Sequence, residues 1–273
     1  MNVFEKQKLA QQNQIFDYYP PKKKYIGAVS IPHSGEVIPE EFKEYLIDDV
    51  KALCQDVDTA VHKLIDIEQL NDVGIAVIKA NIHRVCVDLN RPKETAALNW
   101  QKNSHGIEIV KKELDEKTRA FLTQKYYAPY YEMLKALINE LQRAHKRPSF
   151  IDLHSMPSSP TEYHLKINPN QEMDRPDFCV SDIEGKSCEK EFINFVCEKL
   201  SAHYSKVYQN NPYFGGHVTR HVDATFPDTN NIQIEIKRGI YLDEPKRTLD
   251  ESLVNKLRPA LTTSLIETFQ RFA

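Results

Sequence analysis

The hydrophobic positions of the chain fall into short runs that have the length and composition of buried strands. The first run, residues 26–31 (IGAVSI), ends at Pro32, and a late run at residues 232–236 (IQIEI) carries one carboxylate between isoleucines. Such runs are typical of parallel strands that are covered on both faces. The pattern predicts strands at residues 26–31, 75–79, 84–89, 149–154, 178–181 and 232–236.

Segments with helical spacing of apolar residues lie between these runs. Pro39 precedes one of them as a first-turn proline would, and Pro129 is expected to break the longest into two helices. Helices are predicted at residues 40–53, 59–70, 113–146, 188–204 and 249–272. The alternation of strands and helices predicts the α/β class, with three α/β/α layers and a mainly parallel mixed sheet.

The remaining segments define the expected boundaries. Residues 1–24 are polar and read as a poorly packed N-terminal lead-in, so residues 25–273 are predicted to form a single catalytic domain. Residues 158–174 are rich in loop-forming side chains and are expected near the site. Residues 213–221 (YFGGHVTRH) contain two glycines and read as a mobile loop.

Polar side chains that could bind a metal ion or take part in catalysis follow three of the predicted strands. His33 comes directly after the first strand, Asn90 and Arg91 come just before Pro92, and His154 ends the SFIDLH run. Ligands of open α/β sheets bind beyond the carboxyl ends of the strands. These side chains are therefore expected to meet at one edge of the sheet.

Several carboxylates accompany these residues. Period-two alternation puts Asp152 and His154 on one face, where an aspartate would hold the tautomer of a metal-binding imidazole. Asp56 and Asp58 precede a predicted helix, so each either caps that helix or turns into the site to bind a cation. Glu235 is paired, exposed on one face, or functional. Taken singly, each of these residues also has an ordinary structural interpretation.

Taken together, the residues have the composition of a catalytic zinc site. Two histidines and one carboxylate commonly hold zinc and leave one position open for water. A further glutamate can accept the proton of that water, and arginines can polarise a carbonyl or clamp a carboxylate. The candidate ligands are far apart in the chain, so no local motif specifies them.

Composition narrows the function classes. The 273 residues are 41% hydrophobic and 27% charged with a net charge of -3, which indicates no strong attraction to nucleic acid or to a membrane surface. No run is long enough to span a bilayer, and the N-terminus lacks the apolar core of a signal peptide. The five cysteines form no C-x-x-C pair, which disfavours thiolate zinc and predicts free thiols in the cytoplasm.

An ordered set of motifs resembles the N-formylglutamate amidohydrolase family. The motifs are PHSG at 32–35, DVD at 56–58, RVCVDLNRP at 84–92, DLHS at 152–155, GGHVTRH at 215–221 and IQIEI at 232–236. They cover roughly residues 26–244, most of the chain. The family is related in fold to zinc carboxypeptidases and to aspartoacylase, which use a similar D-L-N-R. The resemblance implies a hydrolase with one zinc ion that cleaves N-formyl-L-glutamate, a small acidic N-acyl amino acid, to glutamate and formate.

The resemblance also implies a set of metal ligands and a general base. His33 and His154 are similar to the zinc ligands, and Asp58 is preferred over Glu36 as the third ligand. Asp56 is then a cap or an outer partner. Glu235 resembles the general base that activates water.

Four further residues are implied to act on the substrate. Arg84 resembles the arginine that stabilises the oxyanion, Asn90 and Arg91 resemble the pair that grips the substrate α-carboxylate, and Arg220 is the candidate for the second carboxylate. The chain departs from the usual family pattern at residues 99–107, 223–231 and 237–239. Those regions are expected to line the acyl or side-chain pocket.

Two other interpretations are retained. One is a peptidase-like amidase that acts on a larger N-acyl or peptide substrate, which predicts an open groove. The other is a catalytically silent protein of the same fold that binds a carboxylate. The presence of Glu235 and of both histidines favours an enzyme.

Overall fold

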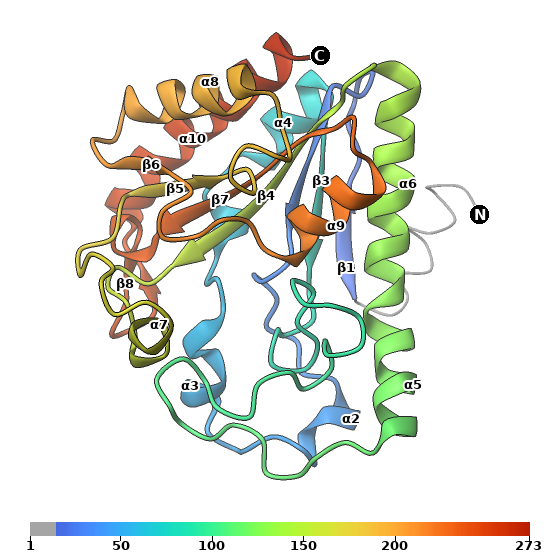
Figure 1. The fold of residues 1–273 in the computed structure, drawn as a ribbon, viewed down its shortest axis with the longest axis vertical. Coiled ribbons are helices and arrows are strands. Elements are labelled where there is room, and N and C mark those ends of the chain that lie inside the picture. The colour runs from blue at the N-terminus through green and yellow to red at the C-terminus, as the bar shows by residue number, and fades with distance from the viewer. Residues whose placement is uncertain (1–14) are drawn as a thin grey trace.

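The computed structural model describes residues 15–273, which form a seven-stranded mixed sheet with helices on both faces (Figure 1). The strand order is β1-β3-β2-β4-β7-β5-β6. The strands are β1 (Phe16–Tyr19), β2 (Gly27–Ile31), β3 (Ile75–Ala80), β4 (Ser149–Met156), β5 (Phe178–Ser181), β6 (Val207–Gln209) and β7 (Asn230–Lys237). The four strands β3, β2, β4 and β7 are parallel, whereas β1 and the β5–β6 pair are antiparallel to them.

Helices cover both faces of the sheet. They are α2 (Glu40–Lys43), α3 (Val50–Leu53), α4 (Ile67–Val73), α5 (Glu116–Tyr126), α6 (Ala128–Ala144), α7 (Glu162–Ile167), α8 (Lys190–Ser201), α9 (His217–Thr225) and α10 (Glu251–Arg271). Short 3₁₀ turns occur at Cys54–Asp56, Val61–Lys63 and Arg238–Ile240, and β8 (Leu242–Asp243) pairs with β9 (Thr248–Leu249). No helix of the described residues is both long and apolar enough to cross a membrane.

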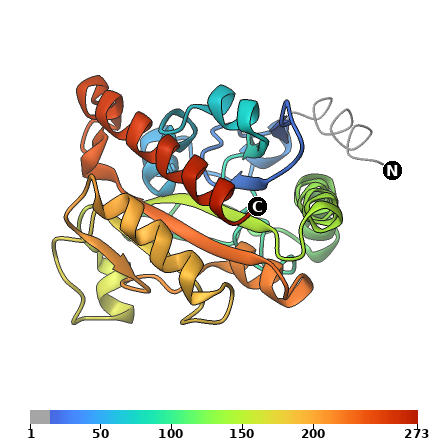
Figure 2. The ribbon, with the colours of Figure 1, turned by 90° about the horizontal axis from the view of Figure 1, so that it is seen from above.

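Two apolar cores follow from the alternation of side chains along the central strands. Ala28 and Phe150 pack into the core that also contains residues of α5, α6 and α9. Their neighbours Val29 and Ile151 pack into the opposite core with residues of α4, α8 and α10. Helices α9 and α10 accordingly lie on opposite sides of the sheet (Figure 2). The predicted three-layer α/β architecture is confirmed.

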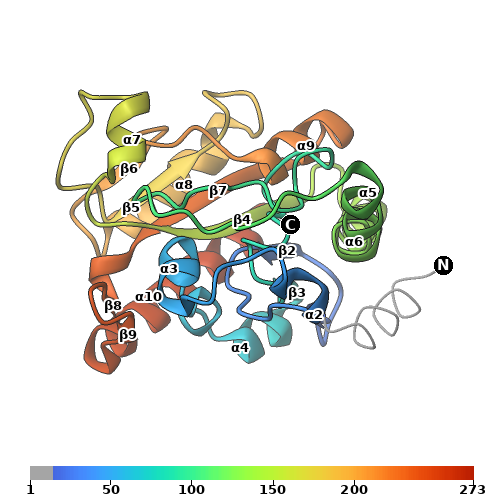
Figure 3. The same cartoon turned by 90° about the horizontal axis from the view of Figure 1, so that it is seen from below.

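The two central strands carry the chemistry. All eight residues of β4 are buried, as expected for a parallel strand covered on both faces, and seven of the eight in β7 are buried. The register pairs His154 of β4 with Glu235 of β7. The carboxyl ends of these strands face the end of the molecule where α3, α7 and the long segment after β3 lie (Figure 3).

The predicted strand at residues 84–89 is wrong. This segment consists of turns, and Val87 makes only an isolated bridge with Ala97. Its apolar side chains are nevertheless buried in the core, which explains the misleading pattern. The sheet has no free edge for it beside β3, because β1 occupies that position, with Phe16 opposite Ala80.

Four other segments also depart from expectation. Residues 40–53 and 59–70 each break into short pieces, because Asp49 and Asp66 start new helices by accepting hydrogen bonds from Ala52 N–H and Gln69 N–H. The supposed loop at 213–221 contains the start of α9. The supposed lead-in contributes β1, with Ile15 and Phe16 each 1% exposed, while residues 1–14 lie outside the described part.

Candidate active site

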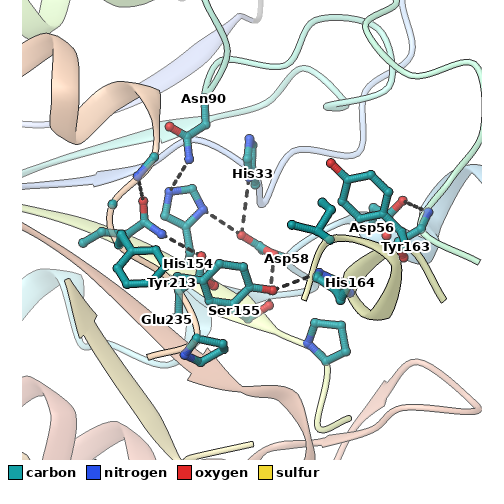
Figure 4. Close-up of a pocket in the computed structure, with 18 of the residues that line it drawn as sticks. His33, Asp56, Asp58, Asn90, His154, Ser155, Tyr163, His164, Tyr213 and Glu235 are labelled. Carbon is teal, nitrogen blue, oxygen red and sulfur yellow. Dashed lines mark hydrogen bonds and ion pairs between the residues drawn. The ribbon is translucent and has the colours of Figure 1, made fainter. Parts of the chain in front are cut away.

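A pocket of about 420 Å³ opens at the carboxyl ends of β2, β4 and β7 (Figure 4). Its wall contains the histidines His33, His154 and His164, the carboxylates of Asp56, Asp58 and Glu235, and the arginines Arg84, Arg91, Arg175, Arg220 and Arg238. Arginines therefore outnumber carboxylates in the wall. Such a lining favours an anionic ligand, although the chain as a whole is slightly acidic.

His33, Asp58 and His154 form a buried cluster. Their candidate ligand atoms all lie within 4.8 Å of one another. Asp58 Oδ2 is 3.1 Å from Nδ1 of His154 and 3.7 Å from Nδ1 of His33. The two imidazole rings are 4.8 Å apart between centroids. The tertiary structure thus unites three side chains that follow different segments of the chain.

Each imidazole is held by a second carboxylate, which contacts its Nε2 atom on the side away from Asp58. Nε2 of His33 lies 2.7 Å from Asp88 Oδ1, and Nε2 of His154 lies 2.8 Å from Asp152 Oδ2. The contact between Asp152 and His154 was predicted from strand alternation and is confirmed. Asp152 is itself held by Ser30, whose hydroxyl donates to Oδ1 over 2.7 Å. These carboxylates place the imidazole protons on Nε2 and leave both Nδ1 lone pairs facing Asp58.

This arrangement is suited to a cation. With the protons on Nε2, the three inward-facing atoms are all acceptors, and they repel one another unless a proton or a metal ion lies between them. Burial by itself would lower the pKa of His154, but the charge of Asp152 and the hydrogen bonds with Asp152 and Asp58 raise it well above its ordinary value. Two imidazole nitrogens and a carboxylate oxygen fit the ligand chemistry of a divalent transition metal.

The two alternative acidic ligands lie elsewhere. Glu36 is exposed, and it is not part of the cluster. Asp56 lines the pocket, where its carboxylate accepts from Ser104 N–H over 2.9 Å. Neither Asp56 nor Asp58 caps a regular helix, because the predicted helix at 59–70 does not form there.

Glu235 lies beside the cluster on the neighbouring strand. Its Oε1 accepts a 2.7 Å hydrogen bond from Gln233 Nε2, and Gln233 Oε1 in turn accepts from Gly216 N–H. Burial raises the pKa of Glu235 above its ordinary value, against the opposing charge of His154. A buried carboxylate whose pKa is raised toward neutrality suits an acid–base role.

The three arginines predicted from sequence all line the pocket, but they differ in their contacts and in their exposure to solvent. Arg84 donates to Asp88 Oδ2 over 2.9 Å, whereas the Arg91 guanidinium stacks 5.1 Å from the Trp100 ring. Asn90 is buried and accepts from Val218 N–H, so its amide nitrogen faces His154 at 3.5 Å. Arg220 is exposed on α9.

Sequence reasoning missed two buried arginines. Arg238 reaches Asp58 Oδ1 over 3.3 Å and Ser155 Oγ over 3.2 Å, and Arg175 is 1% exposed in the pocket wall. Arg238 lies in a segment, residues 237–239, that was expected to line the pocket, and residues 99–107 also contribute, whereas residues 223–231 do not. Arg175 had no such signal, because it lies in a loop between α7 and β5.

Comparison with known proteins identifies the family of this chain. A sequence profile of the N-formylglutamate amidohydrolase family matches residues 28–242. N-formylglutamate deformylase of Pseudomonas putida is 26% identical over 231 residues, 79% of this chain and 81% of that protein. The corresponding Pseudomonas aeruginosa protein is 24% identical over 79% of this chain and 82% of its own length.

Solved structures show the same fold. N-formylglutamate amidohydrolase from Ralstonia eutropha JMP134 superposes with a TM-score of 0.80 at 24% identity, covering 95% of this chain and 98% of that one. Gene product Atu2144 from Agrobacterium tumefaciens gives a TM-score of 0.65 at 19% identity, covering 93% and 95%. The family suggested by the ordered motifs is confirmed by the profile match, and this chain belongs to the N-formylglutamate amidohydrolase family.

Proposed function

We propose that this chain is a zinc-dependent amidohydrolase that converts N-formyl-L-glutamate and water to L-glutamate and formate. The observation that supports this proposal most strongly is the buried group of His33, Asp58 and His154 beside Glu235, in a pocket rich in arginine. The relatives from both Pseudomonas species are named for this deformylation, which supports the same substrate here.

Zinc would be held by Nδ1 of His33, Nδ1 of His154 and a carboxylate oxygen of Asp58. When bound, it supplies a Lewis acid and lowers the pKa of bound water toward roughly 7. The outer carboxylates of Asp88 and Asp152 keep both imidazoles in the tautomer that ligation needs.

Glu235 moves the protons. Its carboxylate accepts a proton from the attacking water and then delivers that proton to the amide nitrogen as the C–N bond breaks. The hydrogen bond from Gln233 holds the carboxylate in place. The products are the free amine of glutamate and formate, so no other reactant is needed.

Arg84 is proposed to stabilise the negative oxygen that develops on the amide carbonyl. Its Nη2 is engaged by Asp88, and its Nε–H has no hydrogen-bond partner among the described residues, so a donor remains. Electrostatic stabilisation of such an oxygen is usually the largest catalytic term.

The acidic ends of the substrate are proposed to contact the remaining basic wall. Asn90 and Arg91 would grip the α-carboxylate, since both line the pocket next to the cluster. Arg220 of α9, the sequence-based candidate for the second carboxylate, also lines the pocket but is exposed.

The proposal predicts metal-dependent release of formate. Purified protein should hydrolyse N-formyl-L-glutamate, lose that activity after treatment with a chelator, and regain it when zinc is added. Elemental analysis should find about one zinc per chain, as expected for a site with one set of ligands. A chain that carries no metal and yet hydrolyses the substrate would contradict the zinc proposal, whereas a zinc-loaded chain without turnover would contradict the substrate.

A second prediction concerns the third ligand. Asp58→Asn should weaken zinc binding by more than roughly the 10–100-fold typical of outer-partner changes, because it removes a ligand charge. Glu36→Gln is the matched control and should leave affinity unchanged, because Glu36 is exposed. Competition with a coloured chelator measures both affinities. A larger loss for Glu36→Gln would show that Glu36 is the ligand.

One observation favours the alternative of a larger N-acyl substrate. Three apolar side chains around the pocket are exposed, with Ile167 at 68%, Phe214 at 47% and Tyr163 at 39%. An apolar rim could contact an acyl chain longer than formyl. A series of N-acyl-L-glutamates separates the two, since a formyl-specific enzyme loses kcat/KM with chain length and the alternative gains it.

A further inference from the structure

Arg175 is a buried cation that has no anionic partner in the part of the chain that the structure describes. It is 1% exposed, yet no carboxylate lies within ion-pair distance of it among residues 15–273. Two other arginines of the pocket differ in this respect, because the half-buried Arg84 pairs with Asp88 and the buried Arg238 pairs with Asp58. A buried charge is costly unless it is paired, so this guanidinium lacks a counter-charge.

The hydrogen bonds of Arg175 to described residues are with neutral groups. Nη1 donates to Tyr213 Oη over 2.9 Å, Nη2 donates to Gln171 Oε1 over 2.9 Å, and the guanidinium lies 5.2 Å from the Tyr213 ring. Its Nε–H is buried and has no hydrogen-bond partner among the described residues. The side chain lines the same pocket as Glu235. Donors therefore remain at the pocket wall for an anion.

Tyr213 adds a second donor, which follows from the tautomer of His164. The backbone N–H of Thr161 donates to His164 Nδ1 over 3.2 Å, so Nδ1 is an acceptor and the ring proton is on Nε2. That Nε2–H donates to Tyr213 Oη over 3.0 Å (Figure 4). Because Arg175 also donates to this oxygen, the proton of Tyr213 is used in neither bond.

The ionisation states agree with this geometry. Burial lowers the pKa of His164 to about 4, so its imidazole is neutral at pH 7. Burial raises the pKa of Tyr213 above its ordinary value, so the phenol keeps its proton. Two donors on the phenolic oxygen strengthen the remaining O–H as a donor.

We propose that Arg175 and Tyr213 form the subsite for the side-chain carboxylate of the acidic amino acid, in place of Arg220. This assignment rests on the proposed function and adds the residues that select glutamate. The carboxylate supplies the counter-charge that Arg175 lacks and accepts from the O–H of Tyr213. Arg220 is a weaker candidate, because it is exposed and screened by water.

The test compares N-formyl-L-glutamate with N-formyl-L-glutamine, which has nearly the same shape but lacks the negative charge. Binding of each is measured by calorimetry on zinc-loaded Glu235→Gln protein, so that the result does not depend on turnover. The starting protein should prefer the glutamate compound. Adding Tyr213→Phe should weaken that compound about 10-fold or more, the worth of a hydrogen bond to a charged group, and change the glutamine compound by less than about 2-fold.

Matched variants complete the experiment. Arg175→Gln should abolish the preference for the glutamate compound. Unfolding midpoints show whether the protein still folds with this buried change. If it does not, the result for Tyr213→Phe decides the test. Tyr163→Phe alters another tyrosine of the same pocket, and Arg220→Gln removes the exposed guanidinium; both should keep the preference.

The outcomes are distinguishable. A starting protein without preference, or a preference that survives Tyr213→Phe unchanged, overturns the subsite. Loss of the preference in Arg220→Gln alone restores the sequence-based assignment and also overturns it. A preference that depends on Arg175 and Tyr213, in an enzyme that releases no formate, supports the subsite and refutes the proposed reaction.

Discussion

Glu235→Gln is expected to lower kcat by about 10²–10⁴-fold, the range typical for loss of a general acid–base group. The amide of glutamine has nearly the same size but cannot accept the proton of the attacking water. It leaves the His33, Asp58 and His154 cluster intact, so bound zinc should stay near one equivalent. Initial rates of formate release and elemental analysis of the same preparation measure the two quantities.

Asp56→Asn provides the control for this variant. Asp56 also lines the pocket, but its carboxylate accepts from the backbone of Ser104 and is not part of the cluster of His33, Asp58 and His154. Its neutralisation should cost little turnover compared with Glu235→Gln. If Asp56→Asn lost most turnover and Glu235→Gln retained it, the general base would be Asp56 instead of Glu235.

His154→Ala is expected to reduce bound zinc well below one equivalent and to remove activity with it. The change deletes one of the ligand atoms and leaves the buried carboxylates of Asp58 and Asp152 without the imidazole that links them. Uncompensated buried charge is strongly destabilising, so the unfolding midpoint should also fall. Zinc content is measured after gel filtration in metal-free buffer.

His164→Ala is the matched histidine control. His164 lines the same pocket but contacts Thr161 and Tyr213, so zinc content should stay near that of the parent chain. Unchanged zinc in His154→Ala would remove His154 from the metal shell. Zinc loss in both variants, with equal loss of stability, would point to general damage to the pocket.

The sequence alone predicted the parts of the fold that depend on local pattern. The apolar runs at 149–154 and 232–236 became β4 and β7 because a strand buried on both faces needs continuous hydrophobic character. Alternation along β4 put Asp152 behind His154. Pro129 separated α5 from α6, since proline lacks the N–H that a continuous helix requires.

Other parts were decided by competition between distant segments. Residues 84–89 have the composition of a strand, but β1 already occupies the edge beside β3. Helix α9 begins at His217 although two glycines precede it. A local pattern contains no information about which of two segments pairs with a given strand edge. Predicting that pairing therefore requires the whole chain.

The site divides in the same way. The sequence by itself determined which residue types stand at the ends of the strands, among them His33, Asn90, His154 and Glu235, and the order of motifs that indicates the family. Only the tertiary structure decided that Asp58 and not Glu36 meets the histidines, and that Arg175 is buried without a counter-charge from any residue of the described part of the chain. The physical reason is that charge pairing and desolvation depend on distances in space between segments far apart in the chain, which spacing along the chain does not encode.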